Sequence, residues 1–243
     1  MRLIDVSAAL PSAVDPAWVA ARGARRRAEE VIGITTGIRC AIEPERITSP
    51  EEIERENDLR RAEAIADGER TAWYVAVSPA VPAHARREIL EASDAVAVEL
   101  VGPLDADAPA IDDIVAEAVR RQLPVRCASA DVLAALAPRH PAARLILARL
   151  GDGGRWHSAL NTVAPLTNVL VDVSGRVAER GMLDAVLFEL GPKRVLWGTG
   201  GAMESGLAQL RALAVIGPGD ETVEAIRWGN AARVFRFAGA RPR

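Results

Sequence analysis

The sequence predicts an α/β protein built as a single (β/α)8 TIM barrel, either regular or distorted. Short β-branched or apolar runs alternate with longer amphipathic stretches, and about eight such pairs can be counted. The chain has 243 residues, of which 49% are hydrophobic, so it can bury one large core within the usual size of a barrel. We therefore expect one domain that spans residues 1–243.

Eight segments are predicted to be strands because each is short, apolar and followed by a stretch of helix length. In chain order they are Leu3–Ser7, Gly37–Ile42, Trp73–Ser78, Ala95–Val101, Pro124–Ala128, Arg144–Leu150, Asn168–Ser174 and Arg194–Gly198. Helix starts are predicted at Asp15-Pro16 and at Ser49-Pro50-Glu51-Glu52, where a capping hydroxyl precedes two acids. A last helix is expected over Ala225–Phe235.

Composition excludes several classes of function. The net charge of −3 comes without a clustered basic face, so nucleic acid is not an expected partner. The sequence has no apolar run long enough to span a bilayer and no apolar leader after Met1, so no membrane partner is expected and a cytoplasmic location is predicted. Cys40 and Cys127 lack C-x-x-C spacing and are expected to be reduced, half-buried thiols.

In a (β/α)8 barrel the working side chains lie at the carboxyl ends of the strands. That rule gives a short set of candidate positions. They are Ser7 at the end of the first strand, Glu99 at the fourth, Arg149 at the sixth, Asp172 and Ser174 at the seventh, Thr199 after the eighth, and His157 in the segment after the sixth strand. We predict Asp172, Glu99 and His157 as candidate catalytic groups, and Arg149, Ser7, Ser174 and Thr199 as candidate ligand-binding groups.

Three motifs resemble a known family. They are Asn168–Gly175, Arg194–Gly200 and Gly229–Phe235, and their order is similar to that of the amidohydrolase 2 branch of the metal-dependent amidohydrolase superfamily. That branch contains hydrolases and nonoxidative decarboxylases, and the resemblance covers nearly the whole chain. It implies an amidohydrolase-like TIM barrel.

Carried over position by position, the ligands of the family's metal centre are missing. Ser7 and Ala9 stand for the paired histidines of the first strand, and Ala128, Arg149 and Gly200 stand for the later ligands. A guanidinium cannot deprotonate to become a ligand, so Arg149 does not replace the histidine. The resemblance therefore implies a degenerate member with no metal and no cofactor.

Three functions remain open. The chain is expected first to be a noncatalytic subunit that stabilises or regulates an active relative in a homo- or hetero-oligomer. Alternatively, it is an active hydrolase or lyase with a rearranged site, acting on a small carboxylate, amide or lactone. In the third interpretation it binds a small anionic ligand, with Arg149 holding the carboxylate.

Several polar residues also have simple structural interpretations. Glu99 is expected to pair with Arg149 or Arg126, which would neutralise buried charge. The cluster that includes Arg25, followed by Glu29 and Glu30, is expected to form a solvated helix face. His84, in the opening turn of a surface helix, and His140, in a loop at the amino end of the barrel, are expected to be structural.

Overall fold

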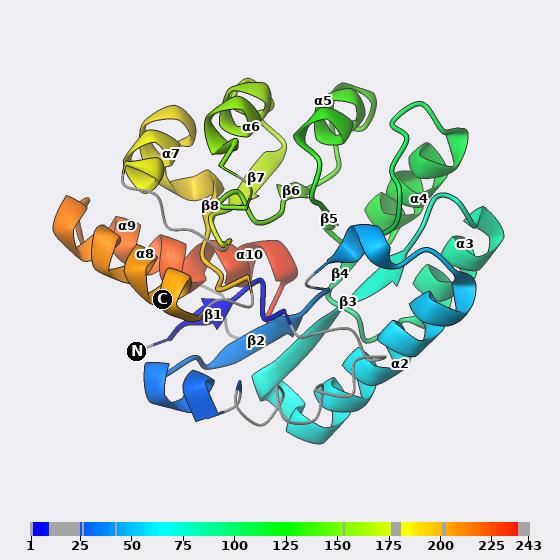
Figure 1. Ribbon diagram of the computed structural model, residues 1–243, viewed down its shortest axis with the longest axis horizontal. Coiled ribbons are helices and arrows are strands. Elements are labelled where there is room, and N and C mark those ends of the chain that lie inside the picture. Colours follow the sequence, from blue (N-terminus) through cyan, green and yellow to red (C-terminus); the bar gives the residue numbers. More distant parts are fainter. Residues whose placement is uncertain are drawn as a thin grey trace.

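The computed structural model has eight parallel strands in one curled sheet with helices around its outside (Figure 1). The structure describes residues 2–9, 25, 27–41, 43–152, 154–175, 181–200 and 203–237. The strands are arranged in chain order from β1 to β8, and each is hydrogen-bonded in parallel to the next. The predicted α/β class is confirmed.

Each of the eight predicted segments overlaps one strand, and most of the strands are shorter than predicted. Their bounds are β1 Ile4–Asp5, β2 Thr36–Arg39, β3 Thr71–Val77, β4 Ala97–Leu100, β5 Val125–Cys127, β6 Leu145–Leu147, β7 Val169–Asp172 and β8 Val195–Leu196. The segments that follow β1 and β8 are hydrogen-bonded to each other through their backbones. The Val6 amide donates to the Trp197 carbonyl at 3.2 Å, and the Gly200 amide donates to the Ser7 carbonyl at 3.0 Å.

Most of the helices follow one another around the outside of the sheet, whereas α10 packs against the core inside the curl (Figure 1). Their bounds are α2 Pro50–Asp67, α3 Pro82–Glu91, α4 Pro109–Arg120, α5 Ala130–Arg139, α6 Trp156–Val163, α7 Met182–Leu190, α8 Met203–Ile216, α9 Asp220–Glu224 and α10 Asn230–Phe235. Residues 27–32 are also helical. No helix in the described part of the chain is long and apolar enough to cross a membrane.

A local sequence signal explains where α2 begins. The Ser49 hydroxyl accepts the Glu52 amide and the Glu52 carboxylate accepts the Ser49 amide, so the predicted start of α2 is confirmed as a capping box. The single helix predicted over Ala225–Phe235 instead comprises a π-helical turn, Ala225–Gly229, and α10. The start predicted at Asp15-Pro16 lies outside the described residues.

The hydrophobic core has two layers. One lies between the sheet and the outer helices and includes Val75, Leu133 and Val171. The other lies inside the curl of the sheet and includes Ile38 and Tyr74. Side chains alternate between the two layers along each strand, and this alternation turns selected polar side chains of the strands inward.

Candidate functional site

The inside of the sheet, at the carboxyl ends of the strands, is filled by buried polar and charged side chains. We call this set the mouth network, and each of its members is 6% exposed or less. Its members are Asp5, Ser7, Arg25, Glu99, Arg126, Asp172 and Thr199. They come from β1, β4, β5 and β7, from the segments after β1 and β8, and, for Arg25, from a helical position that precedes β2.

Arg126 lies at the centre of the mouth network. Its guanidinium donates to the Glu99 carboxylate and, at 2.6 Å, to the Ser7 hydroxyl, and it lies 3.7 Å from the Asp172 carboxylate. It also lies over the Tyr74 ring, at 5.4 Å from the centroid. Burial alone would lower the pKa of Arg126, but Cys40 and Glu99 raise the pKa above its ordinary value. Arg126 is therefore a permanent buried cation that links three strands.

Glu99 is held by two guanidinium groups. Besides Arg126, the Arg60 guanidinium lies 2.9 Å from its carboxylate, and the Ala41 amide donates to the same carboxylate oxygen at 3.1 Å. The expected pairing of Glu99 with Arg126 is confirmed, whereas Arg149 pairs with another residue. The Glu99 carboxylate is thus held by two guanidinium groups and one backbone amide.

Arg25 departs from the expectation of a solvated helix face. Its side chain is buried, donates to the carboxylates of Asp5 and Glu29, and reaches the Thr199 hydroxyl at 2.7 Å. The Thr199 hydroxyl in turn donates to Asp5 at 2.7 Å. The expectation was wrong for Arg25. Its Nε atom donates to Glu29, four residues later, as on a solvated helix face, but its two terminal nitrogens donate to Thr199 and Asp5 at the strand ends.

The Asp172 carboxylate accepts its hydrogen bonds from the residues that follow β6 and β7. Its carboxylate accepts the amide and the hydroxyl of Ser174, both at 2.9 Å, and the Arg149 amide at 3.3 Å. Burial raises the pKa of Asp172 despite these bonds and the nearby Arg126. Asp172 and Glu99 therefore meet only through the guanidinium that lies between them.

Two predicted site residues lie apart from the mouth network. The Arg149 side chain pairs with Asp152 at 2.8 Å, and only its backbone reaches Asp172. His157, in the first turn of α6, is exposed and stacks on the Trp156 ring, with 3.4 Å between centroids. The structure therefore brings Glu99 and Asp172 near each other but does not bring His157 to them.

The loop after β8 leaves no space for a side chain at Gly200. This glycine has a φ of +61°, and a Cβ atom there would lie 2.9 Å from the Gly175 amide nitrogen. At Gly198, a Cβ atom would lie 2.9 Å from the Ser7 Cβ and 3.0 Å from Asp172. Packing around the mouth network is thus too close for even one added carbon.

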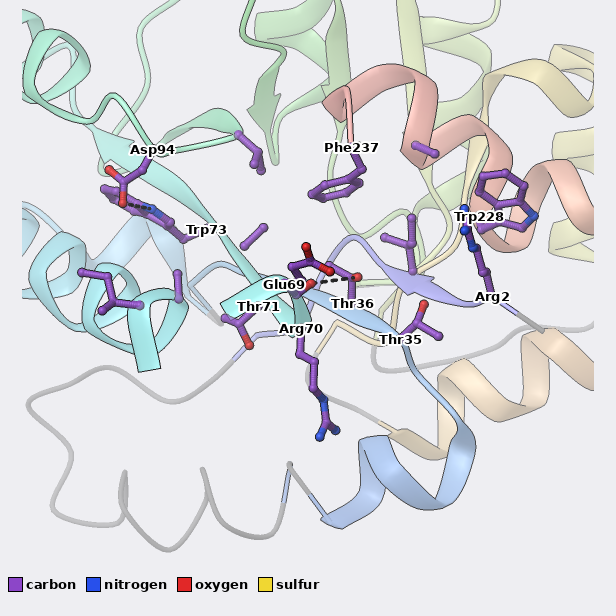
Figure 2. Close-up of a pocket in the computed structure, with 16 residues that line it drawn as sticks. Arg2, Thr35, Thr36, Glu69, Arg70, Thr71, Trp73, Asp94, Trp228 and Phe237 are labelled. Atoms are coloured by element: carbon purple, nitrogen blue, oxygen red, sulfur yellow. Dashed lines mark hydrogen bonds between the residues drawn. The ribbon is translucent and has the colours of Figure 1, made fainter. Parts of the chain in front are cut away.

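Two cavities lie outside the mouth network. One of about 370 Å³ lies at the carboxyl ends of β5 and β6, beside α5 and α6, and is lined by Ser129, Arg149 and Arg155. A larger one of about 640 Å³ lies at the amino ends of β1, β2 and β3. In Figure 2, Trp73 and Asp94 lie on one side of it and Trp228 with Arg2 on the other, with the Phe237 ring between them.

Sequence reasoning treated Arg126 only as a possible neutralising partner and missed Tyr74. The Tyr74 hydroxyl donates to the Val6 carbonyl at 2.8 Å, and burial raises its pKa well above the ordinary range. One signal was available. A lone arginine at the centre of a short apolar strand, Val125–Cys127, must point to one of two buried faces, and a buried guanidinium requires acidic partners.

Comparisons with known proteins agree on the fold. A family model described as amidohydrolase matches residues 45–237. The structure is similar to 2,6-dihydroxybenzoate decarboxylase from Rhizobium, with a TM-score of 0.78, 17% identity, and coverage of 98% of this chain and 100% of that one. No curated protein matches the chain by sequence.

Two further solved structures are similar. One is 5-carboxyvanillate decarboxylase from Sphingomonas paucimobilis, with a TM-score of 0.77, 16% identity, and coverage of 98% of this chain and 99% of that one. The other is a zinc-bound amidohydrolase from Burkholderia multivorans, with a TM-score of 0.71, 19% identity, and coverage of 98% and 100%. At these identities the likeness supports the fold alone.

Proposed function

Because the chain belongs to the amidohydrolase family, whose model matches residues 45–237, we propose that it is a degenerate member that acts as a noncatalytic subunit. In this proposal the sheet closes as a (β/α)8 barrel, the family's metal centre has been lost, and the chain stabilises or regulates an active relative. The backbone hydrogen bonds from Val6 to Trp197 and from Gly200 to Ser7 support closure.

The buried guanidinium of Arg126 is the observation that carries the proposal. It contacts groups from β1, β4 and β7 in the part of the barrel where this fold places its reactive centre. A fixed cation there satisfies the carboxylates that would otherwise attract a metal ion, and it repels any second cation. Each carboxylate of the mouth network therefore already has a cationic partner.

The residues at the family's ligand positions do not fit a metal centre. Ser7 is engaged with Arg126, and Arg149 is a permanent cation paired with Asp152. At Gly200 the backbone conformation and the nearby Gly175 leave no room for the aspartate that the family carries. Among the described residues, the one group of three metal-ligating side chains lies outside the barrel, on α2 and α3.

Co-expression with a metal-binding amidohydrolase from the same genome tests the proposal. We expect a stoichiometric complex in which the active chain keeps its activity longer on heating than it does alone. The chain by itself is expected to give no decarboxylation of 2,6-dihydroxybenzoate with added zinc or manganese. Turnover by the isolated chain that disappears in Asp172→Asn would instead establish the active lyase and overturn the proposal.

A second candidate function, the binding of a small anion, is favoured by the cavity beside Arg149. An incoming carboxylate would replace Asp152 on the Arg149 guanidinium. In this case Asp152→Asn would tighten binding of benzoate in calorimetry, and Arg149→Gln would abolish it. Equal, unmeasurable binding by all three proteins would exclude this function for benzoate-like anions.

A further inference from the structure

Three potential metal ligands meet on the outside of the barrel, between α2 and α3. Glu54 lies on α2, and His84 and Glu88 lie one helical turn apart on α3. Their i,i+4 spacing places the imidazole and the carboxylate on the same face of the helix, toward Glu54. His84 was expected only to open a surface helix, yet its side chain is just 10% exposed.

The distances between these ligand atoms suit a tetrahedral ion. The His84 Nε2 atom lies 3.2 Å from a Glu54 oxygen and 3.7 Å from a Glu88 oxygen, and all three ligand atoms lie within 4.8 Å of one another. Bonds of about 2.0–2.2 Å to zinc give tetrahedral edges of about 3.3–3.6 Å. An ion therefore fits among the three atoms after small side-chain movements.

Asn57, on α2, holds the Glu88 carboxylate in place through the oxygen that lies farther from His84. The Asn57 amide donates to the second Glu88 oxygen at 2.7 Å. Asn57 is fixed by two hydrogen bonds to the backbone of Ala76 in β3, at 2.7 Å and 3.0 Å. Metal-ligating carboxylates are commonly oriented by such outer contacts. This arrangement leaves the other Glu88 oxygen directed at His84.

The imidazole interacts with its surroundings through one nitrogen. The buried Nδ1 atom of His84 has no hydrogen-bond partner in the described part of the structure, so its polar contacts are those of Nε2 with the two carboxylates. A cavity of about 330 Å³, lined by Glu54, Glu88 and Asn57, lies beside these contacts. It has room for the water that completes an open zinc site.

The structure also provides a cation that competes for the same oxygens. The Arg87 guanidinium contacts Glu54 and lies 3.8 Å from Glu88. Its side chain is 51% exposed, so it can turn into solvent when an ion binds. We propose that Glu54, His84 and Glu88 form a zinc site that clips α2 to α3, with Arg87 as its competing cation.

Calorimetric titration of the metal-free protein with zinc tests this site. We expect one ion per chain and a higher Tm with zinc present. His84→Gln and Glu88→Gln should each weaken binding at least tenfold, and Arg87→Gln should tighten it several-fold. His140→Gln is the matched control. His140 directly follows α5, and its imidazole pairs at 2.6 Å with one carboxylate, that of Asp112 on α4.

The variants distinguish zinc bound between α2 and α3 from zinc bound inside the barrel. Circular dichroism and the metal-free Tm first establish that each variant is folded. No binding at 100 micromolar zinc, or equal binding by the wild type and His84→Gln, would overturn the site. Binding that is lost in Asp172→Asn but kept in His84→Gln would place the ion inside the barrel and would contradict both this site and the proposed function.

Discussion

The two ends of the sheet differ in how they are filled. At the carboxyl ends of the strands, buried arginines and carboxylates pack so closely that Gly198 has no room for a Cβ atom. At the amino ends of β1, β2 and β3 there is a cavity of about 640 Å³, lined in part by Trp73, Trp228 and Phe237 (Figure 2). The interior at the carboxyl ends, where a barrel ordinarily places its reactive groups, is thus the closely packed one, and a smaller cavity of about 370 Å³ lies at its edge beside β5 and β6.

The difference teaches that polar side chains at strand ends do not by themselves make a site. Removing a carboxylate or guanidinium from water is costly, and only good pairing offsets that cost. In the mouth network each carboxylate is paired with a buried arginine, and Glu99 gains a second one, Arg60, from outside the network. At the hollow end the charged groups are at the rim and exposed, as in the pair of Arg70 and Glu30, which are 54% and 58% exposed.

The largest expected effect comes from removing the central cation. Arg126→Met should destabilise the protein by about 3–5 kcal/mol, because it leaves Glu99 and Asp172 buried with fewer cationic partners. Arg70→Met, at the hollow end, should cost about 1 kcal/mol or less, because its pair with Glu30 is solvated. Urea denaturation of the two variants measures the contrast. Equal losses would mean that the two ends are energetically alike.

Enlarging a side chain at each end of the sheet should also change stability unequally, but by less than the loss of Arg126. Gly198→Ala should destabilise by about 1–3 kcal/mol, because the new methyl group meets Ser7 and Asp172. Ala64→Leu extends toward the large cavity and should change stability by less than about 1 kcal/mol. The midpoints of thermal unfolding provide the test. A Gly198→Ala variant as stable as the wild type would show that the closed end can relax.

The smallest expected effect is a dependence on pH. Burial raises the pKa of Glu29, but Arg39 and Arg25 lower it further, so its pKa in the folded protein is below 4.5. A lowered carboxyl pKa contributes stability above the unfolded value, and that stability is lost as the pH falls through the folded value. Glu29→Gln should therefore cost about 1 kcal/mol at pH 7 and progressively less below pH 4.5.

Glu30→Gln is the matched control for this measurement, since Glu30 is the next residue and its pair with Arg70 is exposed. Its urea midpoint should follow that of the wild type from pH 7 to pH 3.5. A difference between Glu29→Gln and the wild type that stays constant over this range would show that Glu29 contributes through packing and not through its charge.

Local signals were enough to predict the fold. The eight strands follow from short apolar runs, and the capping box of α2 follows from Ser49 and Glu52, because both signals depend on residues close in sequence. The candidate site was predicted only in part. Glu99, Asp172, Ser7 and Thr199 were named, but their partners depend on which strands become neighbours.

Arg25 and His157 show where sequence reasoning stopped. The spacing of Arg25 and Glu29 is the same in a solvated helix as in the buried contact, so the pattern could not show that Arg25 reaches Asp5. His157 follows the correct strand, but its position in the first turn of α6 turns its ring to solvent. Both outcomes depend on how a helix is rotated against the sheet.

The mouth network also has a consequence for the order of folding. Ser7 and Arg126 are 119 positions apart in the chain, and Asp5 and Thr199 are 194 positions apart. Contacts between such distant positions form only after long loops have closed, and proteins that depend on them fold slowly. The interior arginines would thus stay hydrated until the segments that follow β1 and β8 meet, so their burial marks a late step of folding.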